Sequence, residues 1–359
     1  MATINFKFSK DIKKFGAKDF DACFNCGNCT AICDLSDSDN SFPRKMIRYT
    51  TLGIQDEIKT SLDPWLCYYC GDCSQSCPRQ ANPGNLMMSL RRWLTSKYDW
   101  TGLSGLLYRS MWNYIIGFLF IAIFIAGAYM KDVFTQEEWL HYGHLFEMFA
   151  IAGVFVVILF PNIVRMWFFS VWKPTKKINI KPYFVAITDL LVHMFTQKRS
   201  LDCQKERTDT LWYVEHLLLV FSYLSLLVIT VFLDWFSTES VFLNVFGYVV
   251  SGVIFIVTAD FVRRRIHKTS EKSKFSHPSD WFFVIWLFMM GLSAFAVRLF
   301  IDLDLLENNF WLYLFHLTIL VQWALIIVPF GKWTHFLYRS FAMYFARILN
   351  TPDKEKTKK

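Results

Sequence analysis

Two closely spaced runs of cysteines constrain this chain more than any other feature. The first run has the spacing Cys-x2-Cys-x2-Cys-x3-Cys, and the second run repeats that spacing and ends in Cys-Pro. Eight of the nine cysteines belong to these runs: Cys23, Cys26, Cys29, Cys33, Cys67, Cys70, Cys73 and Cys77. Thiolates at this spacing suit cubane iron–sulfur clusters, in which four cysteines hold one [4Fe–4S] core. The pattern therefore predicts two such clusters.

The order of the ligands follows from the way such runs fold. In two-cluster proteins the fourth cysteine of each run ligates the other cluster. Cluster 1 is then expected on Cys23, Cys26, Cys29 and Cys77. Cluster 2 is expected on Cys67, Cys70, Cys73 and Cys33. Structural zinc also uses Cys-x2-Cys pairs, but it rarely needs this four-cysteine run twice over. Disulfides are disfavoured because the cysteines are tightly clustered and nothing marks the domain as secreted.

Composition separates the first hundred residues from the rest of the chain. Hydrophobic residues make up 54% of the 359 residues and aromatic residues 18%, which is too apolar for a soluble redox protein and indicates membrane segments. The first hundred residues are instead polar, charged and rich in cysteine. We therefore expect three parts: a two-cluster ferredoxin-like domain over 1–100, a transmembrane domain over 101–340 and a basic tail over 341–359.

Local signals predict a mostly helical cluster domain. Residues 3–8 have the composition of a short strand. The spacer between the cysteine runs predicts a helix over about 43–51, with Gly53 just past its end. Asn82-Pro83-Gly84 reads as a turn, and a basic helix is expected over about 85–97, leading to the membrane surface. Lysines interrupt any apolar signal-peptide core at the N-terminus, so the cluster domain is expected in the cytoplasm, where thiols stay reduced.

Six apolar stretches follow, each about as long as the roughly 20 residues that cross a bilayer as a helix. They lie at about 110–130, 143–169, 211–233, 242–262, 281–301 and 310–330. The fold class predicted from these features is mainly α, with the helical two-cluster domain followed by a six-helix transmembrane bundle. Residues 173–210 contain an apparent amphipathic helix over 183–197, which would lie in the membrane interface or brace the cluster domain.

Charge in the connecting segments predicts the orientation. Segments 173–210, 263–280 and 331–359 carry 8, 6 and 7 Lys and Arg, whereas segments 131–142, 234–241 and 302–309 carry 1, 0 and 0. The positive-inside rule therefore puts the first set, the cluster domain and the C-terminus in the cytoplasm of a multi-pass inner-membrane protein. The net charge of +8 comes mostly from the connecting segments that set the orientation in the membrane. The same basic residues can contact anionic lipid headgroups. No base-reading module accompanies it, so a nucleic-acid partner is not expected.

Histidines in the apolar half are candidate haem ligands, because ionisable groups within membrane spans are functional candidates by default. Pairing by depth gives His216 and His335 for an inner haem b, and His144 and His316 for an outer one. His316 and His335 lie about 28 Å apart on an ideal helix, near its two ends. They would not share a face of that helix, but Pro329 between them can kink it. Met148 is the next candidate if His144 is not a ligand.

These features resemble known families. The two runs, Pro43-Arg44-Lys45, Leu52-Gly53 and Trp65-Leu66-Cys67 resemble the iron–sulfur C subunit of heterodisulfide reductases. The last span, with His316, Pro329-Phe330 and His335, resembles the haem b subunits of heterodisulfide reductase and respiratory nitrate reductase. His216 matches one further haem ligand of that family, but Leu226 stands where the other is expected.

The fusion of both halves resembles the C subunit of quinone-interacting membrane-bound oxidoreductases of sulfur metabolism. A pattern before the third span, loosely matched by His193, Phe195, Cys203 and Arg207, adds to that resemblance. The resemblance implies one or two haem b groups and a quinone substrate, menaquinone being favoured. It also implies soluble flavin and iron–sulfur partner subunits in a complex of which this chain is one part.

Three functions fit these features to different degrees. The favoured one is a membrane-anchored electron-transfer subunit linking the quinone pool, b haems and two clusters to a soluble partner. The main alternative is the membrane subunit of a heterodisulfide reductase-like thiol or disulfide complex, although this chain has no adjacent cysteine pair for such catalysis. A redox-sensing transporter is less favoured, because no repeated halves are evident. No G-x-G-x-x-G fingerprint follows a strand, so the chain is not expected to use NADH by itself.

Overall fold

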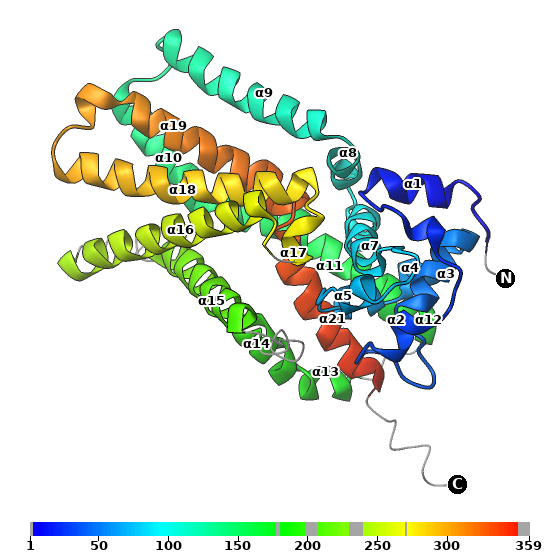
Figure 1. Ribbon diagram of the computed structural model, residues 1–359. Coiled ribbons are helices and arrows are strands. Elements are labelled where there is room, and N and C mark those ends of the chain that lie inside the picture. The colour runs from blue at the N-terminus through cyan, green and yellow to red at the C-terminus, as the bar shows by residue number, and fades with distance from the viewer. Residues whose placement is uncertain (1–2, 177–179, 198–206, 230–239, 270, 351–359) are drawn as a thin grey trace. The chain divides into compact units, whose positions relative to one another are not determined.

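The computed structural model describes residues 3–176, 180–197, 207–229, 240–269 and 271–350 (Figure 1). All regular elements in these ranges are helices, so the predicted mainly α fold is confirmed. By packing, the chain forms two compact units. The first contains Met1–Arg109, Phe160–Gln204 and Thr334–Lys359, and the second contains Ser110–Leu159 and Lys205–Trp333. The expected boundary at residue 100 remains a proposal.

Short helices form the N-terminal part of the first unit. They are α1 (Phe8–Lys14), α2 (Asn28–Ala31), α3 (Arg44–Leu52), α4 (Gln55–Thr60), α5 (Asp63–Leu66), α6 (Asp72–Gln75), α7 (Pro83–Tyr98) and α8 (Leu103–Arg109). The helices predicted over 43–51 and 85–97 are thus confirmed as α3 and α7. Gly53 ends α3 at φ 75°, and a Cβ there would lie 2.3 Å from the Asn5 carbonyl oxygen. Only glycine suits that position.

The strand predicted over residues 3–8 is wrong. A strand would have put Ile4, Phe6 and Phe8 on one buried face, because side chains alternate along a strand. The first two are instead exposed, Phe6 to 89%. Phe8 begins α1 and is buried together with Ile12, which lies one turn later. Helical spacing therefore buries more apolar surface here than alternation would.

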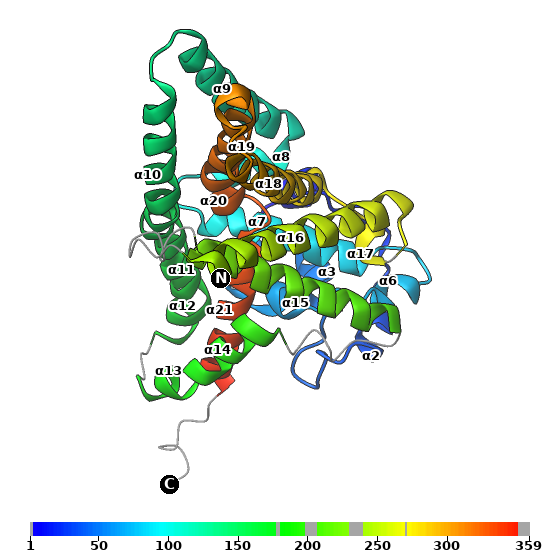
Figure 2. The same cartoon turned by 90° about the vertical axis from the view of Figure 1, so that its left-hand side faces the viewer.

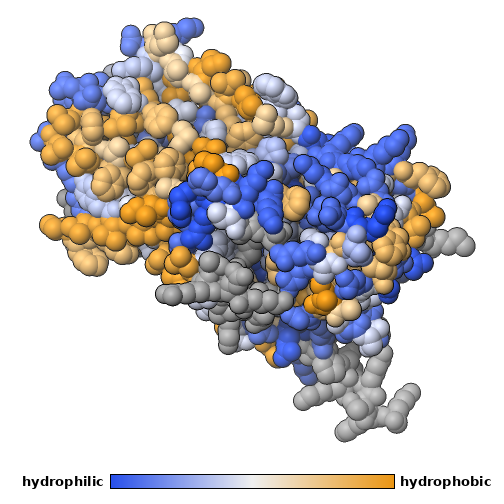
Figure 3. Space-filling view, in the orientation of Figure 1, coloured by the Kyte–Doolittle hydropathy of each residue, from blue (hydrophilic) through white to orange (hydrophobic). Residues whose placement is uncertain are grey.

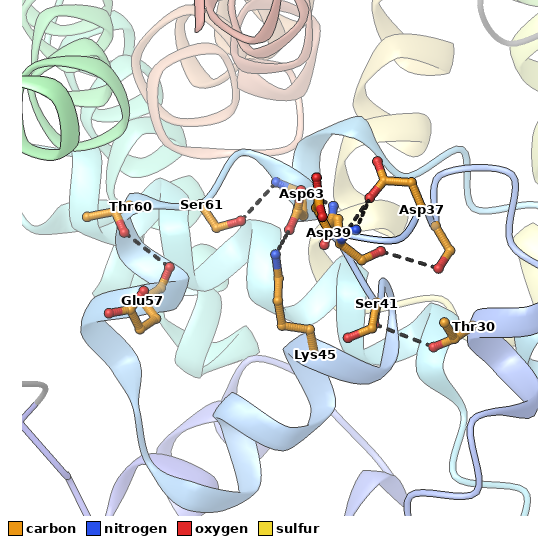
Figure 4. Close-up of polar contacts among 11 residues, drawn as sticks. Thr30, Asp37, Asp39, Ser41, Lys45, Glu57, Thr60, Ser61 and Asp63 are labelled. Atoms are coloured by element: carbon orange, nitrogen blue, oxygen red, sulfur yellow. Dashed lines mark hydrogen bonds and ion pairs between the residues drawn. The ribbon is translucent and has the colours of Figure 1, made fainter. Parts of the chain in front are cut away.

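Polar contacts fix the spacer between the two cysteine runs (Figure 4). Lys45 of α3 pairs with Asp63 at the start of α5, with Nζ 3.0 Å from Oδ2. Asn40 donates to the other carboxylate oxygen of Asp63 at 3.1 Å. The Thr30 hydroxyl donates to the Ser41 carbonyl at 3.4 Å, so the loop is also tied to the first run. These contacts hold the segment before α5 and hence the start of the second run.

Later segments complete the first unit. They are α11 (Phe160–Trp167), the π-helical η3 (Phe168–Trp172), α12 (Lys173–Thr175), α13 (Lys181–Val185), α14 (Ile187–Thr196) and α21 (Thr334–Asn350). The amphipathic helix predicted over 183–197 is therefore divided at Ala186. Residues 341–350 of the expected basic tail belong to α21, and residues 351–359 lie outside the described ranges. One core joins these helices to the N-terminal ones, with Met166, Val171 and Ala342 among its buried members.

Long apolar helices form the second unit. They are α9 (Met111–Met130), α10 (Gln136–Val154) with the π-helical η2 (Phe155–Leu159), α15 (Arg207–Leu227), α16 (Val241–His267) and α18 (Pro278–Asp302). The short α17 (Glu271–Lys274) precedes α18, and α19 (Trp311–Gln322), the π-helical η8 (Trp323–Ile327) and α20 (Val328–Phe330) close the unit. α16 packs between α15 and α18, as Figures 1 and 2 both show. Gly291 permits this, since a Cβ there would lie 3.0 Å from the Phe255 backbone nitrogen.

Six helices among the described residues are long and apolar enough to cross a membrane. They are Met111–Met130, Gln136–Thr175, Thr210–Leu227, Val241–His267, Pro278–Asp302 and Trp311–Asn350, which agree with the six predicted spans. In Figure 3, orange residues predominate on the visible surface of the long apolar helices, and blue residues gather over the N-terminal helices of the first unit. Exposed apolar side chains on this scale indicate a membrane protein.

The last span is not one regular helix. The π-helical η8 precedes Pro329, whose ring cannot donate the usual helical hydrogen bond. Gly331 then takes an extended conformation (φ −98°, ψ −162°), and α21 begins at Thr334. His316 lies on α19 and His335 on α21, so the expectation that one helix carries both is wrong. Pro329 and Gly331 are the physical reason.

Gly143 is the point at which α10 packs on α19, and its replacement tests that packing. A Cβ there would lie 2.0 Å from the Tyr313 hydroxyl oxygen, which now donates to the Trp139 carbonyl at 3.2 Å. We expect Gly143→Ala to lower the free energy of unfolding in detergent by about 1–3 kcal/mol. Gly153→Ala on the same helix is the matched control, because its Cβ would meet nothing within 4 Å. Adding Tyr313→Phe to Gly143→Ala should restore part of the lost stability, because it removes the clashing hydroxyl. Equal losses of stability in Gly143→Ala and Gly153→Ala would refute the packing.

Candidate functional site

The two cysteine runs fold into loops of the same local shape. Two positions after the first cysteine of each run, Asn25 and Tyr69 both have positive φ, at 65° and 60°. The glycines after the second cysteines, Gly27 and Gly71, have φ of 89° and 93°. A one-turn helix follows each glycine, α2 in the first run and α6 in the second, and these two helices pack together. The repeated spacing therefore encodes a repeated backbone conformation.

These loops aim backbone amides at cysteine sulfurs. Asn25 N donates to Cys23 Sγ at 3.4 Å, and Tyr69 N donates to Cys67 Sγ at the same distance. Ala81 N donates to Cys77 Sγ at 3.3 Å. Positive φ at Asn25 and Tyr69 turns the chain back toward the sulfur. Hydrogen bonds to cysteine sulfur stabilise a thiolate and tune the potential of a cluster that it holds.

Three other thiols surround Cys29 in the first group. Burial raises the pKa of the Cys29 thiol, and the nearby Cys23, Cys26 and Cys77 thiols raise it further. Cys77 comes from the second run, so the structure brings it to the first three cysteines. Asn28 Nδ2 donates to the Ser76 carbonyl at 2.6 Å, which links the two runs at this point.

The second group brings the fourth cysteine of the first run to the first three of the second. Burial, with a smaller contribution from the nearby Cys67 and Cys70 thiols, raises the pKa of the Cys33 thiol to about 11. Burial also raises the pKa of the Cys73 thiol, and the neighbouring Cys67, Cys70 and Cys33 thiols add to this increase. In the described ranges no three His, Cys, Asp or Glu side chains converge on a single metal ion. Each group therefore brings four thiols near one another without placing them around a single metal ion.

These raised pKa values say what the groups need in order to bind metal. A thiol must lose its proton to become a ligand, and thiols with raised pKa values stay protonated at neutral pH unless a cation is present. Four sulfur donors with amide hydrogen bonds fit an iron–sulfur cluster, whose iron ions supply that positive charge. The donor chemistry of both groups therefore fits a [4Fe–4S] cluster.

Comparison with known proteins decides the nature of this region. Residues 22–81 match the model of the 4Fe-4S dicluster domain. This chain therefore carries a domain for two [4Fe–4S] clusters, as the cysteine spacing predicted. It covers only the N-terminal part of the molecule.

Curated relatives match the same N-terminal region. A protein of Archaeoglobus profundus named as similar to the C subunit of heterodisulfide reductase is 33% identical over 104 residues, which cover 29% of this chain and 55% of that protein. The C subunit of the H(2):CoB-CoM heterodisulfide,ferredoxin reductase of Methanothermobacter marburgensis is 35% identical over 77 residues, covering 21% and 42%. The chain thus spans about half the length of the curated relatives it matches.

The comparisons bear on the first half of the predicted resemblance. Homology to the N-terminal region of the heterodisulfide reductase C subunit is confirmed, and it supports iron–sulfur electron transfer by one member of a redox complex. No solved structure matches this chain.

A cluster of packed aromatic rings begins at Trp65, two residues before Cys67. Trp65 packs against Tyr338 of α21 with ring centroids 5.3 Å apart. Tyr98 at the end of α7 packs against Tyr338 at 5.4 Å and against Phe169 of η3 at 6.5 Å. The second cysteine run therefore rests on α21, the helix that carries His335.

Among the candidate haem ligands, His316 has the most informative contact. Its Nδ1 lies 2.9 Å from the Ser293 hydroxyl oxygen of α18, and that hydroxyl also lies 3.3 Å from the Met290 carbonyl. The hydroxyl can donate to the carbonyl and accept from Nδ1–H. This tautomer leaves a lone pair on Nε2, the arrangement that metal-ligating histidines use.

The other three histidines lie on different elements. His144 is exposed on α10, next to Gly143, which packs on Tyr313 and Leu317 of α19; it is therefore level with His316. His216 on α15 stacks on Trp212 with ring centroids 5.1 Å apart. His335 lies in the first turn of α21 and belongs to the first unit, whereas His216 belongs to the second.

Several charged groups in the apolar half have structural partners. Arg165 donates to the carbonyls of Tyr98 and Lys97 at the end of α7. Arg264 pairs with Glu215 at 2.8 Å and with Asp260. Arg298 donates to Asn244 Oδ1 at 2.9 Å. These partners account for the charges without a cofactor.

The sequence pattern missed two residues that contact the candidate sites. Ser293 is one of many small polar residues in apolar spans, and only the fold sets it against His316. Arg91 looked like part of a basic surface helix but lies partly buried against the second cysteine run. Cys203, the ninth cysteine, lies outside the described ranges.

Proposed function

We propose that this chain is the membrane-anchored electron-transfer subunit of a quinone-interacting oxidoreductase complex. One observation carries the proposal most strongly: α21 bears His335 and also packs Tyr338 against Trp65, two residues before Cys67. Three residues of helix rise about 4.5 Å, so a candidate haem ligand stands one turn from the support of the cysteine site. Such closeness suits electron transfer between two cofactors.

The proposed ligands are those derived from the cysteine spacing. The cluster of the first group is held by Cys23, Cys26, Cys29 and Cys77, and the cluster of the second by Cys33, Cys67, Cys70 and Cys73. The two thiol groups described above support this crossed assignment. When bound, such clusters accept and release single electrons. The surrounding chain holds the thiols, buries those of Cys29 and Cys67 and donates amide hydrogen bonds to three of the eight.

The proposed haem ligands are two pairs of histidines. His216 and His335 bind an inner haem b, and His144 and His316 bind an outer one. The hydrogen bond with Ser293 supports His316 as a ligand. Gly143 of α10, next to His144, packs on α19 beside the turn that carries His316, and this contact supports the outer pairing. Haem and quinone chemistry belong to the cofactors; the chain supplies ligands and a dry helical environment.

The proposed setting follows from the topology and the resemblance. The cluster domain and the C-terminus face the cytoplasm, because the basic connecting segments belong on that side. Soluble flavin and iron–sulfur subunits exchange electrons with the cluster domain, and quinone, menaquinone being favoured, reacts in the membrane half. Dissimilatory sulfur metabolism is the proposed context.

A second candidate is the membrane subunit of a heterodisulfide reductase-like thiol or disulfide complex. It is favoured by one observation, namely that the matched relatives are named as heterodisulfide reductase subunits. Both candidates share the clusters and differ in the soluble partner. Copurification followed by assay of the partner for thiol or for flavin chemistry distinguishes them.

A pyridine haemochrome assay on the purified chain tests the haem proposal. Two haem b groups per polypeptide are expected from the two histidine pairs. One haem per polypeptide would mean that only one of the two histidine pairs binds haem, and the assignment of the other pair would be wrong. No haem would overturn the electron-transfer role of the membrane half and leave only a membrane-anchored cluster domain.

Ser293→Ala gives a sharper test of the outer site. Loss of the hydroxyl removes the partner of His316 Nδ1, and such losses typically weaken metal binding by about 10–100-fold. We expect the purified variant to lose haem on dilution or detergent washing more readily than the parent chain. Ser251→Ala is the matched control, because that buried hydroxyl donates to the Gly247 carbonyl of its own helix. Equal haem retention in both variants would contradict the role of Ser293.

A further inference from the structure

Arg91 of α7 holds the segment that leads into the second cysteine run. Its Nε donates to the Pro64 carbonyl at 2.7 Å. Its Nη2 donates to the Trp65 carbonyl at 3.3 Å and also to the carbonyl of Cys67. The guanidinium therefore bonds to three carbonyls of the short backbone segment that ends at a cluster ligand. Arg91 also lies over the Trp65 ring, 5.8 Å from its centroid.

No carboxylate among the described residues pairs with Arg91. All of its hydrogen bonds within those ranges go to backbone carbonyls or to Met88 Sδ. Burial lowers the pKa of Arg91 from its usual value, yet a guanidinium stays charged at neutral pH. Arg339 of α21 adds a second positive charge nearby.

The exposed Arg79 makes one hydrogen bond to the segment before the first run, from Nε to the Ala22 carbonyl at 3.4 Å. In the part of the chain that the structure describes, the first cysteine group therefore has no arginine that bonds to several carbonyls as Arg91 does. Its Cys26 is exposed, so water screens charges around it. Arg44 also lies near this loop, with Nη1 3.1 Å from where a Cβ on Gly27 would lie. Within the described ranges the Arg44 side chain makes no hydrogen bond or ion pair, and it does not bond to a cysteine carbonyl. The two repeated loops therefore sit in different electrostatic surroundings.

We propose that Arg91 raises the reduction potential of the cluster held by Cys67, so that this cluster is reduced in preference to the one held by Cys26. The inference rests on the proposed function, in that it requires both groups to hold clusters. Reduction by one electron adds a negative charge to a cluster. A positive charge fixed in a partly buried place favours that reduced state. Because carbonyl bonds hold the guanidinium, it cannot move away to be solvated.

The test is a redox titration of the full chain, purified in detergent and followed by electron paramagnetic resonance. In Arg91→Met, the equilibrium constant for reducing one cluster should fall at least tenfold, which is about 59 mV for one electron. The other cluster should keep its midpoint. Arg91→Lys retains the charge and should shift the equilibrium constant by less than about threefold. Arg44→Met is the matched control and should leave the Arg91-dependent cluster unchanged.

Cluster identity and folding are checked in the same series. The affected signal should be the one that disappears in Cys70→Ala, and iron and acid-labile sulfide should match the parent in Arg91→Met. If Arg91→Met loses the cluster, Arg339→Met decides, and it should lower the midpoint of the same cluster. Unchanged midpoints, or equal shifts of both clusters, would overturn the inference. Absence of both clusters from the parent chain would instead overturn the proposed function.

Discussion

Cys77→Ala should destroy the cluster of the first cysteine run, although Cys77 belongs to the second run. The reason is the crossed grouping, in which the Cys77 thiol lies near Cys29 and Cys33 lies near Cys67 and Cys70. The variant should lose about half of the iron, because one of two four-iron clusters is lost. Its remaining paramagnetic signal should be the same as that of Cys29→Ala.

Two further variants complete this test. Cys33→Ala should instead match Cys73→Ala, since both belong to the second group. Cys203→Ala is the control, because Cys203 stands outside both runs and should retain all the iron. If Cys77→Ala matched Cys73→Ala, each run would hold its own cluster and the crossed assignment would be wrong.

His335→Ala should remove one haem and disconnect quinone from the clusters. We expect the haem content to fall by one group per chain, while iron and sulfide stay at the parent level. Reduced clusters should then be oxidised by quinone at least about 100-fold more slowly, because a lost ligand removes the cofactor nearest α21. The rate is measured by stopped-flow absorbance after rapid mixing.

A surface histidine provides the control for this effect. His267 is exposed in the last turn of α16, and His267→Ala should keep both the haem content and the rate. Full haem content in His335→Ala would show that His335 is not a ligand. Loss of clusters together with haem would mean that α21 acts only as a support.

The cluster region could be predicted from the sequence because its chemistry is local. Cys-x2-Cys-Gly-x-Cys fixes both the donors and the positive φ of Gly27 and Gly71 over a few residues. The six spans could also be predicted, because the need to satisfy backbone hydrogen bonds in lipid leaves a long apolar run few other folds.

Long-range packing could not be predicted in the same way. Nothing in residues 331–350 shows that Tyr338 packs on Trp65, since that contact joins segments 273 residues apart. The break after Phe330 depends on how Pro329 and Gly331 act together, and hydropathy treats both sides as one span. Arg91 was misread for the same reason: a basic residue on a helix expected at the membrane surface gives no local sign that its partners are backbone carbonyls.

The most direct test of the whole account is oxidation of the reduced chain by quinone. The purified full chain is reduced with dithionite, freed of excess reductant, and mixed without oxygen with a soluble menaquinone analogue. The account predicts that the cluster signals in electron paramagnetic resonance and the reduced haem b absorbance both disappear. Ferricyanide serves as the positive control, since it oxidises exposed clusters directly. Cluster signals that persist with quinone but vanish with ferricyanide would contradict an electron route between the membrane half and the cluster domain.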